Sequence, residues 1–264
     1  MFTHCFHSFK VSLLRIRLSR TILLGISVAL MPSLGLCTET NPSSAPQDKS
    51  DPALTPFDLS YAATYNGMDI DARRQLTLQS GRYTLSTTAK NMLSNIEEHG
   101  EFLVEEDGLI IDQGYKYKRS ILGMKKTEKL RYDRKTGVAN YHSKKKKRQV
   151  ALKDGYLNRL SYQVQLRRDL INGVSPLQYQ VISRGRLKPY NFEVMGEETL
   201  ETPLGNIKTV KVKRIRKDDD RETFFWFAPQ WNHLLVQLWQ REKGGEDYKI
   251  VLQDGMLNNQ KLRN

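Results

Sequence analysis

Residues 57 to 90 read FDLSYAATYNGMDIDARRQLTLQSGRYTLSTTAK, and this stretch decides the fold. Apolar and polar residues alternate along it, which is typical of β-strands that bury one face. The dipeptides Asn66-Gly67 and Ser80-Gly81 interrupt the alternation and favour tight hairpin turns. The stretch therefore predicts a meander of three antiparallel strands.

Similar patterns on both sides of residue 156 extend this sheet. We expect further hairpin turns at Asp107-Gly108, Lys135-Thr136-Gly137, Ser183-Arg184-Gly185, Pro203-Leu204-Gly205, Asp218 to Asp220 and Gly244-Gly245. Roughly ten to twelve antiparallel strands result from this pattern of turns. The sequence thus predicts a mainly β fold, in which a large curved antiparallel sheet is open or rolled into a half-barrel.

One segment breaks the alternation. In GYLNRLSYQVQLRRDLING, apolar residues recur at helical spacing, and Asn172-Gly173 provides a stop signal. We expect one amphipathic helix near residues 156–171, packed on the sheet. The helix could plug the mouth of the curved sheet or cover one open side of it.

The N-terminus has the layout of a secretory signal. An apolar run follows a basic, acid-free segment, and it is shorter than the roughly 20 residues that span a bilayer comfortably. We interpret residues 1–37 as a signal peptide cleaved after Cys37, which predicts a periplasmic protein. Two alternatives remain open, an uncleaved membrane anchor and a lipoprotein acylated at Cys37. The stretch LGLC resembles a lipobox, although Leu36 does not fit it.

The rest of the chain divides into a tether and one domain. Residues 38–56 are rich in Pro, Ser, Thr and Asp and predict a disordered linker. Residues 57–264 predict a single antiparallel β domain. The only other cysteine, Cys5, lies in the signal, so no disulfide is expected and the core alone must stabilise the domain.

The chain is basic, with a formal net charge of +13. Removing the four basic residues of the signal leaves 38 Lys and Arg against 29 Asp and Glu, a charge of +9. Five of these residues form one run, Lys144, Lys145, Lys146, Lys147 and Arg148. The run is interpreted as a solvated strand end, or as a contact to lipid, lipopolysaccharide phosphates or acidic glycan. Nucleic acid is not an expected partner outside the inner membrane.

No catalytic or metal-binding motif is recognisable. The histidines of the exported portion, His99, His142 and His233, are far apart, and none has a metal-ligand neighbour at the usual spacing. The acids of KDDDRE, residues 217–222, are interpreted as a solvated turn. We therefore assign no catalytic residue, no metal and no cofactor, and expect a non-enzymatic protein.

Aromatic residues crowd the C-terminal strands, above all in FFWF at residues 224–227. Because neighbouring side chains of a strand point to opposite faces, at least one set of these rings should face the helix. One interpretation is ordinary core. The other is a ligand groove with Arg167 or Arg168 at its rim and with walls formed by Tyr190, Phe192, Phe225 and Trp226.

Three motifs of the second half carry a family resemblance. They are S-x-x-x-Q-L-R from Ser161 to Arg167, G-x-E-x-x-x-T-P-x-G from Gly196 to Gly205, and W-F-A-P from Trp226 to Pro229. The chain resembles the bacterial exported domain of unknown function 3108 family over most of residues 57–254. The resemblance implies a curved sheet similar to the lipoprotein-carrier fold, and it brings no established chemistry.

Three functional hypotheses follow. The first is a protein that binds or chaperones an amphiphilic or anionic envelope component, which predicts a sizeable apolar cavity with basic residues at its mouth. The second is a structural or interaction protein of the envelope. Such a protein would have an envelope protein partner and no small-molecule ligand, and its own helix would fill the concave face of the sheet. The third is an envelope hydrolase, which predicts two carboxylates, or a histidine and a hydroxyl, converging in one cleft.

Overall fold

The structure is a computed structural model that describes residues 51–65, 68–217, 221–242 and 247–264. The predicted signal peptide, most of the predicted linker, and the predicted turns at Asn66-Gly67, Asp218 to Asp220 and Gly244-Gly245 lie outside the described residues. The remaining chain forms one compact unit.

The described residues form sixteen strands, one α-helix and two short 3-10 helices. The helical elements are η1 (Pro52–Leu54), α1 (Ser161–Ile171) and η2 (Pro229–Trp231). The strands are β1 (Phe57–Tyr65), β2 (Met68–Gln79), β3 (Arg82–Lys90), β4 (Ser94–Val104), β5 (Ile110–Ile121), β6 (Met124–Asp133), β7 (Val138–Ser143), β8 (Lys146–Ala151), β9 (Tyr156–Leu157), β10 (Leu177–Ser183), β11 (Arg186–Thr202), β12 (Gly205–Ile215), β13 (Arg221–Ala228), β14 (Leu234–Glu242), β15 (Asp247–Leu257) and β16 (Gln260–Lys261).

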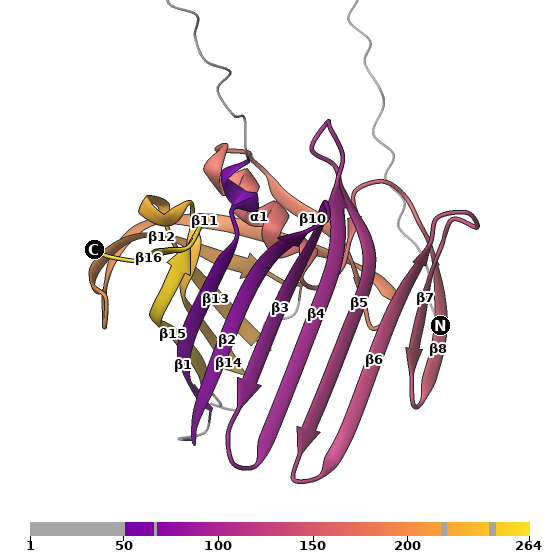
Figure 1. Ribbon diagram of the computed structural model, residues 1–264, viewed down its shortest axis with the longest axis horizontal. Coiled ribbons are helices and arrows are strands. Elements are labelled where there is room, and N and C mark those ends of the chain that lie inside the picture. The colour runs from indigo at the N-terminus through magenta and orange to yellow at the C-terminus, as the bar shows by residue number, and fades with distance from the viewer. Residues whose placement is uncertain (1–50, 66–67, 218–220, 243–246) are drawn as a thin grey trace, which may run out of the picture. The chain divides into compact units, whose positions relative to one another are not determined.

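All sixteen strands belong to one sheet, in the order β8-β7-β6-β5-β4-β3-β2-β1-β15-β14-β13-β12-β11-β10-β9, with β16 paired to β15. The predicted class is confirmed, since this is a mainly β fold with a large curved sheet and one helix. Figure 1 shows β1 to β8 as one wall, with β12, β13 and β14 behind it. The predicted strand number was too low, partly because β9 and β16 have only two residues and cannot show alternation.

The helix begins later than predicted. Residues 156–157 form β9, which pairs in parallel with β10, so α1 is the crossover between two neighbouring parallel strands. The start of α1 is fixed by Asn158, whose Oδ1 accepts hydrogen bonds from Leu160 N at 2.7 Å and Ser161 N at 3.0 Å. These bonds satisfy two amide groups at the helix N-terminus, which have no partner within the helix.

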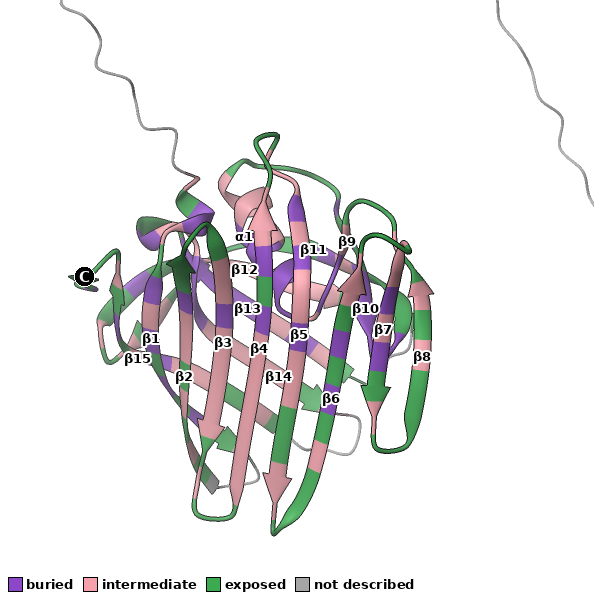
Figure 2. Cartoon of the chain, turned by 45° about the vertical axis from the view of Figure 1, so that its right-hand side comes forward, coloured by how far each residue is buried: buried purple, intermediate pink, exposed green. Residues whose placement is uncertain are grey.

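The core lies between the helix and the curved sheet. Tyr162, Val164 and Leu166 of α1 are buried, and the Tyr162 ring lies 5.1 Å from Tyr190 and 5.9 Å from Phe192, measured between centroids. Figure 2 shows that buried residues gather near the helix, whereas the far ends of β4, β5 and β6 are intermediate or exposed. Because each such buried apolar side chain contributes about 1.5–3 kcal/mol, the helix end of the sheet holds most of the stability.

A strap at the N-terminal end of the domain packs on the helix. Ala53 of η1 is fully buried, and the Arg167 side chain donates to the backbone oxygens of Ala53 at 3.1 Å and Pro52 at 3.2 Å. This strap, which includes η1, lies within residues 38–56, the range interpreted as a linker. The three residues of η1 are too few to form a strand. They can still be buried, because the guanidinium of Arg167 satisfies the carbonyl groups of Pro52 and Ala53.

The two ends of the sheet approach each other where the β10–β11 turn meets β7 and β8. Arg148 Nη1 donates to Arg184 O at 3.0 Å. Arg184 and Gly185 form this turn, and both have positive φ, 52° and 69°. A Cβ atom added to Gly185 would lie 2.8 Å from the Tyr141 side chain.

Gly185→Ala will lower the free energy of unfolding by about 1–3 kcal/mol, because an alanine at positive φ is strained and its methyl group overlaps Tyr141. Urea unfolding measures the loss. Gly81→Ala is the matched control, because φ there is +77° and nothing lies within 4 Å of the added Cβ. Equal losses in the two variants would show that contact with Tyr141 contributes nothing.

Candidate anion-binding cleft

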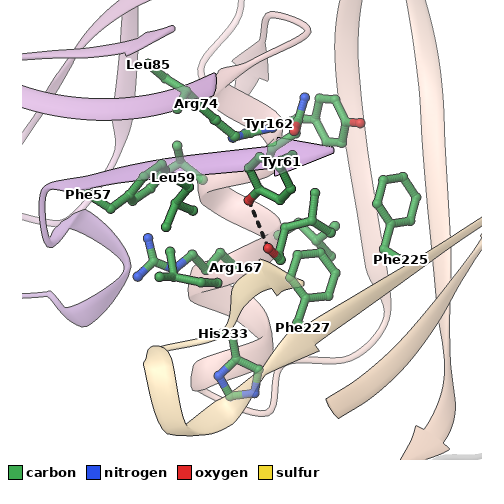
Figure 3. A pocket seen from close by; sticks show the side chains of 15 residues that line it. Phe57, Leu59, Tyr61, Arg74, Leu85, Tyr162, Arg167, Phe225, Phe227 and His233 are labelled. Atoms are coloured by element: carbon green, nitrogen blue, oxygen red, sulfur yellow. Dashed lines mark hydrogen bonds between the residues drawn. The ribbon is translucent and has the colours of Figure 1, made fainter. Parts of the chain in front are cut away.

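The apolar interior beside α1 holds no large cavity in the part of the chain that the structure describes. Its cavity has a volume of about 30 Å³, and its walls include Phe57, Leu59, Tyr61 and Phe227 (Figure 3). Tyr61 Oη donates to Leu235 O at 2.8 Å, so its hydroxyl is satisfied internally. Ligand pockets usually measure about 300–1,000 Å³, and this cavity holds about one or two waters. An acyl chain does not fit here.

The six residues of the predicted groove do not lie together. Tyr190, Phe192 and Phe225 pack around α1, where Phe192 and Phe225 have centroids 5.9 Å apart. Trp226 faces the other side of β13, where its Nε1 donates to Glu198 Oε2 at 3.0 Å. Strand alternation is the reason for this separation.

The two arginines of the predicted groove hold backbone groups. Arg167 Nε donates to Asn232 O at 2.6 Å, and its other nitrogens bind the strap. Burial lowers the pKa of Arg167 to about 10, which leaves it charged at neutral pH. Arg168 pairs with Asp51 and donates to Gly108 O at 2.6 Å. Both guanidinium groups therefore connect α1 to neighbouring segments of the domain.

A polar cleft adjoins the apolar cavity, since Tyr162 and Gln163 contribute to the walls of both. The cleft has a volume of about 300 Å³. Six cationic side chains line it against one carboxylate, Glu98. The cations are Arg159, Arg184, Lys188, Arg214, Arg216 and Arg221.

Strand alternation and one turn bring these cations together. Lys188 and Tyr190 lie two residues apart on β11, so both face the same side of the sheet. Arg214 lies near the end of β12, and Arg216 comes directly after the last residue of that strand. Arg214 stands opposite Phe192 in the β11–β12 register, which directs it to the concave face. Arg184 belongs to the β10–β11 turn, Arg159 to the segment before α1, and Arg221 begins β13.

Arg214 is held against an aromatic ring. Its guanidinium carbon lies 3.5 Å from the Tyr190 ring centroid, and its Nε is buried without a hydrogen-bond partner among the described residues. Burial raises the pKa of Tyr190, but the positive charges of Arg214 and Arg159 and the hydrogen bonds with Ser183 and Arg214 together lower that pKa overall. The stacked guanidinium is thus positioned in advance, which reduces the entropic cost of binding an anion.

The single carboxylate of the cleft is already engaged. Glu98 accepts a hydrogen bond from Tyr115 Oη and lies 3.6 Å from Arg159 Nη2. At the rim, Arg221 pairs with Glu242. Arg184, Lys188 and Arg214 also line the cleft, so its cations outnumber these acids and the cleft is electropositive.

The basic run borders this cleft. Lys144 and Lys145 form the turn between β7 and β8, and Lys146, Lys147 and Arg148 begin the edge strand β8. The four lysines are exposed, whereas Arg148 is half-buried and contacts Arg184 O at the cleft rim. A contact between this run and an anionic surface stays a prediction.

One buried acid forms a polar network at the start of α1. Asp112 is fully buried, and its Oδ2 accepts hydrogen bonds from Asn158 N at 2.6 Å, Ser161 Oγ at 2.9 Å and Tyr132 Oη at 3.1 Å. Burial raises the pKa of Asp112 to about 7. Because Ser161 is also fully buried, this acid and hydroxyl are inaccessible to a substrate, and the network stabilises the helix start.

Neither a metal-binding cluster nor a membrane-spanning helix occurs among the described residues. Within residues 51–65, 68–217, 221–242 and 247–264, no three His, Cys, Asp or Glu side chains are grouped so as to hold a metal ion. In the same residues, no helix is long and apolar enough to cross a membrane.

Sequence reasoning missed most of the cleft residues, among them Arg159, Lys188 and Arg214. The signal was present in KVKRIR, residues 211–216, where cations occur on both faces of one strand. The alternate spacing of Arg214 and Arg216 predicts that these two cations share one face of the sheet. Arg159 and Arg184 had no such signal, because they lie outside the strands.

Comparison with known proteins places the chain in a family. No curated protein sequence matches it. Solved structures that are similar include a "putative lipoprotein" from Parabacteroides distasonis ATCC 8503, with 13% identity, 76% of this chain and 95% of that chain covered, and a TM-score of 0.31. Another is a "putative exported protein with YmcC-like fold" from Bacteroides fragilis NCTC 9343, with 10% identity, the same coverage of 76% and 95%, and a TM-score of 0.29. The family model matches residues 60–253, and the chain therefore belongs to the family described as protein of unknown function (DUF3108).

Proposed function

We propose that this chain is an exported, non-enzymatic protein of the bacterial periplasm that binds an anionic envelope component in its basic cleft. One observation carries the proposal: six cationic side chains and one carboxylate line a concave volume of about 300 Å³. The ligand is expected to carry phosphate or carboxylate groups, as lipid head groups, lipopolysaccharide phosphates and acidic glycans do.

The electrostatics of the cleft support an anionic ligand. Cations that share a concave, partly buried site repel one another, and an anion relieves that repulsion. Arginine forms paired hydrogen bonds with phosphate and carboxylate, and five of the six cations that line the cleft are arginines. The basic run beside the cleft adds a positive field that would steer an anion toward it.

The size of the interior indicates which part of an amphiphile would be bound. The cavity of about 30 Å³ beside α1 does not accept an acyl chain, so recognition rests on the charged head. Export is supported by the basic and apolar character of residues 1–37.

A second function has its own supporting observation. Helix α1 fills the concave interior, as expected for an interaction protein of the envelope that has no small-molecule ligand. Its partner would then contact the basic run and edge strand β8. Absence of anion binding in the following experiment would favour this function.

Arg214→Gln will weaken the binding of inorganic pyrophosphate and glucosamine 6-phosphate at least fivefold, because a charge-assisted contact contributes about 1.5–3 kcal/mol. Isothermal titration calorimetry of the exported protein at low and physiological salt measures this change. Lys208→Gln is the matched control, since Lys208 lies exposed on the same strand and outside the cleft lining.

Two results would contradict the proposal. One is that neither anion binds the natural protein at low ionic strength. The other is that Lys208→Gln weakens binding as much as Arg214→Gln does, since binding would then depend on overall charge and not on the cleft.

A further inference from the structure

The outer side of strands β12 to β15 carries a second hollow, away from the basic cleft. Its volume is about 300 Å³, and three aromatic rings line it together with an amide and two ammonium groups. We call it the outer hollow, and its lining residues are Phe224, Trp226, Trp239, Gln237, Lys211 and Lys249.

Alternation along β13 separates the two sites. Phe225 and Phe227 face α1 and the apolar cavity, so Phe224 and Trp226 point to the opposite side of the sheet. The register pairs Phe224 with Trp239 of β14, and Trp226 with Lys211 of β12 cross-strand. The outer hollow is therefore an independent site, and the inference does not rest on the proposed function.

The rings of the outer hollow are fixed in advance. Phe224 and Trp239 are stacked with centroids 5.6 Å apart and planes at 22°, and Phe224 lies 6.1 Å from Trp226. Trp226 is only 5% exposed, and its Nε1 is held by Glu198. Rigid rings bind a ligand with little loss of conformational entropy.

Charged groups of both signs surround these rings. Lys211 pairs with Glu198 at 3.0 Å, and its ammonium lies 5.0 Å from the Trp226 centroid. Arg241 pairs with Asp247 at 3.2 Å and lies 4.7 Å from the Trp239 ring. Partly exposed ion pairs of this kind add little stability, and they place charges of both signs around the rings.

We propose that the outer hollow binds a sugar ring of an acidic glycan. A pyranose has a face of C–H groups that can lie on an aromatic ring, while its hydroxyl groups can pair with Gln237 and Glu198 at the edge. A carboxylate on the sugar would meet the ammonium groups of Lys211 and Lys249.

The same chemistry disfavours an anionic membrane as the occupant. The rings lie recessed in a hollow, so they cannot insert into a bilayer as protruding side chains would. An anionic membrane would also bring a continuous layer of negative charge against Glu198, Glu222 and Asp247, whereas an acidic glycan carries separate carboxylates that can be placed against the lysines. An acidic sugar can contact groups of both charges, because its hydroxyl groups donate hydrogen bonds to carboxylates and its own carboxylate pairs with ammonium groups.

Tryptophan fluorescence tests the proposal directly, because two of the three tryptophans of the chain line the hollow. The exported protein is titrated with oligomers of galacturonic acid, of mannuronic acid and of hyaluronan. At least one acidic oligomer is expected to change the emission saturably, and to bind at least tenfold more tightly than its neutral counterpart of the same length.

Variants then locate the binding. Trp239→Leu will weaken binding of the acidic oligomer at least tenfold by calorimetry, and Lys249→Gln will reduce the preference for the acidic over the neutral sugar. Lys129→Gln, which removes an exposed cation on distant β6, will leave binding unchanged. Far-ultraviolet circular dichroism and urea unfolding check that Trp239→Leu is folded.

Two outcomes would overturn the inference. One is that none of the three acidic oligomers changes the emission at millimolar concentration. The other is that phosphatidylglycerol vesicles bind in a Trp239-dependent manner while the sugars do not, which would assign the outer hollow to a lipid surface. Pyrophosphate binding in the basic cleft is measured separately, so failure of one site is distinguishable from failure of the other.

Discussion

Arg167→Met will lower the free energy of unfolding by about 3–5 kcal/mol, as expected when a buried, fully engaged charged group is removed. The guanidinium of Arg167 donates to the backbone oxygens of Asn232, Ala53 and Pro52 at 2.6, 3.1 and 3.2 Å. Methionine keeps the apolar stem but has no donor. Three carbonyl groups at the junction of the strap, α1 and the loop after η2 would lose their partner.

Urea unfolding and limited proteolysis measure this effect. The strap loses its attachment in Arg167→Met, so cleavage near residues 51–57 will accelerate before global unfolding. Arg73→Met is the control, because Arg73 forms an exposed ion pair with Asp58 and should change stability by less than about 1 kcal/mol. A loss in Arg167→Met as small as that in Arg73→Met would show that the carbonyl groups find other donors.

Raising the pH from 5 to 8 will lower the free energy of unfolding by about 3 kcal/mol through Asp112 alone, at about 1.4 kcal/mol per pKa unit. Burial raises the pKa of this carboxyl from 3.8 to about 7, so between these values the folded state holds a proton that the unfolded state releases. Stability is therefore greatest at low pH in this window and falls as pH rises toward 7. Above that pH the full cost of a buried carboxylate is present.

Asp112→Asn isolates this contribution. The amide cannot ionise, and its oxygen can still accept from Asn158 N, Ser161 Oγ and Tyr132 Oη. We expect the variant to gain stability relative to the natural protein as pH rises from 5 to 8. Urea unfolding of both proteins across this pH range gives the difference between their free energies of unfolding. The contributions of the other titrating groups are the same in both proteins and cancel in this difference. Parallel pH profiles would rule out a raised pKa for Asp112.

The architecture was largely predictable because its signals are local. Alternation over residues 57–90 and positive-φ turns such as Ser80-Gly81 specify hairpins between strands adjacent in sequence. The pairing of β1 with β15 joins residues at opposite ends of the domain, and no local pattern encodes it. The start of α1 was misplaced because it depends on the side chain of Asn158.

The site was less predictable because its geometry is tertiary. Alternation predicts that Phe225 and Trp226 face opposite sides, but it does not reveal which side is concave. The partners of Arg167 are backbone groups of η1 and of the segment after η2, which sequence pattern does not bring together. The cations of the cleft come from five separate segments, so only the folded sheet places them in one volume.

The pairing of the first and last long strands has a consequence for connectivity. Phe57 lies opposite Leu257, and Asn258 N donates to Pro56 O at 2.8 Å, so the two ends of the domain are neighbours. A circular permutant that joined these ends and opened the chain between β8 and β9 would run through the sheet in strict succession, from β9 to β15 and then from β1 to β8. Apart from the parallel pair β9 and β10, the natural chain is thus a meander that is cut between β1 and β15. The large sequence separation of the β1–β15 contact results from the place of this cut and not from the architecture.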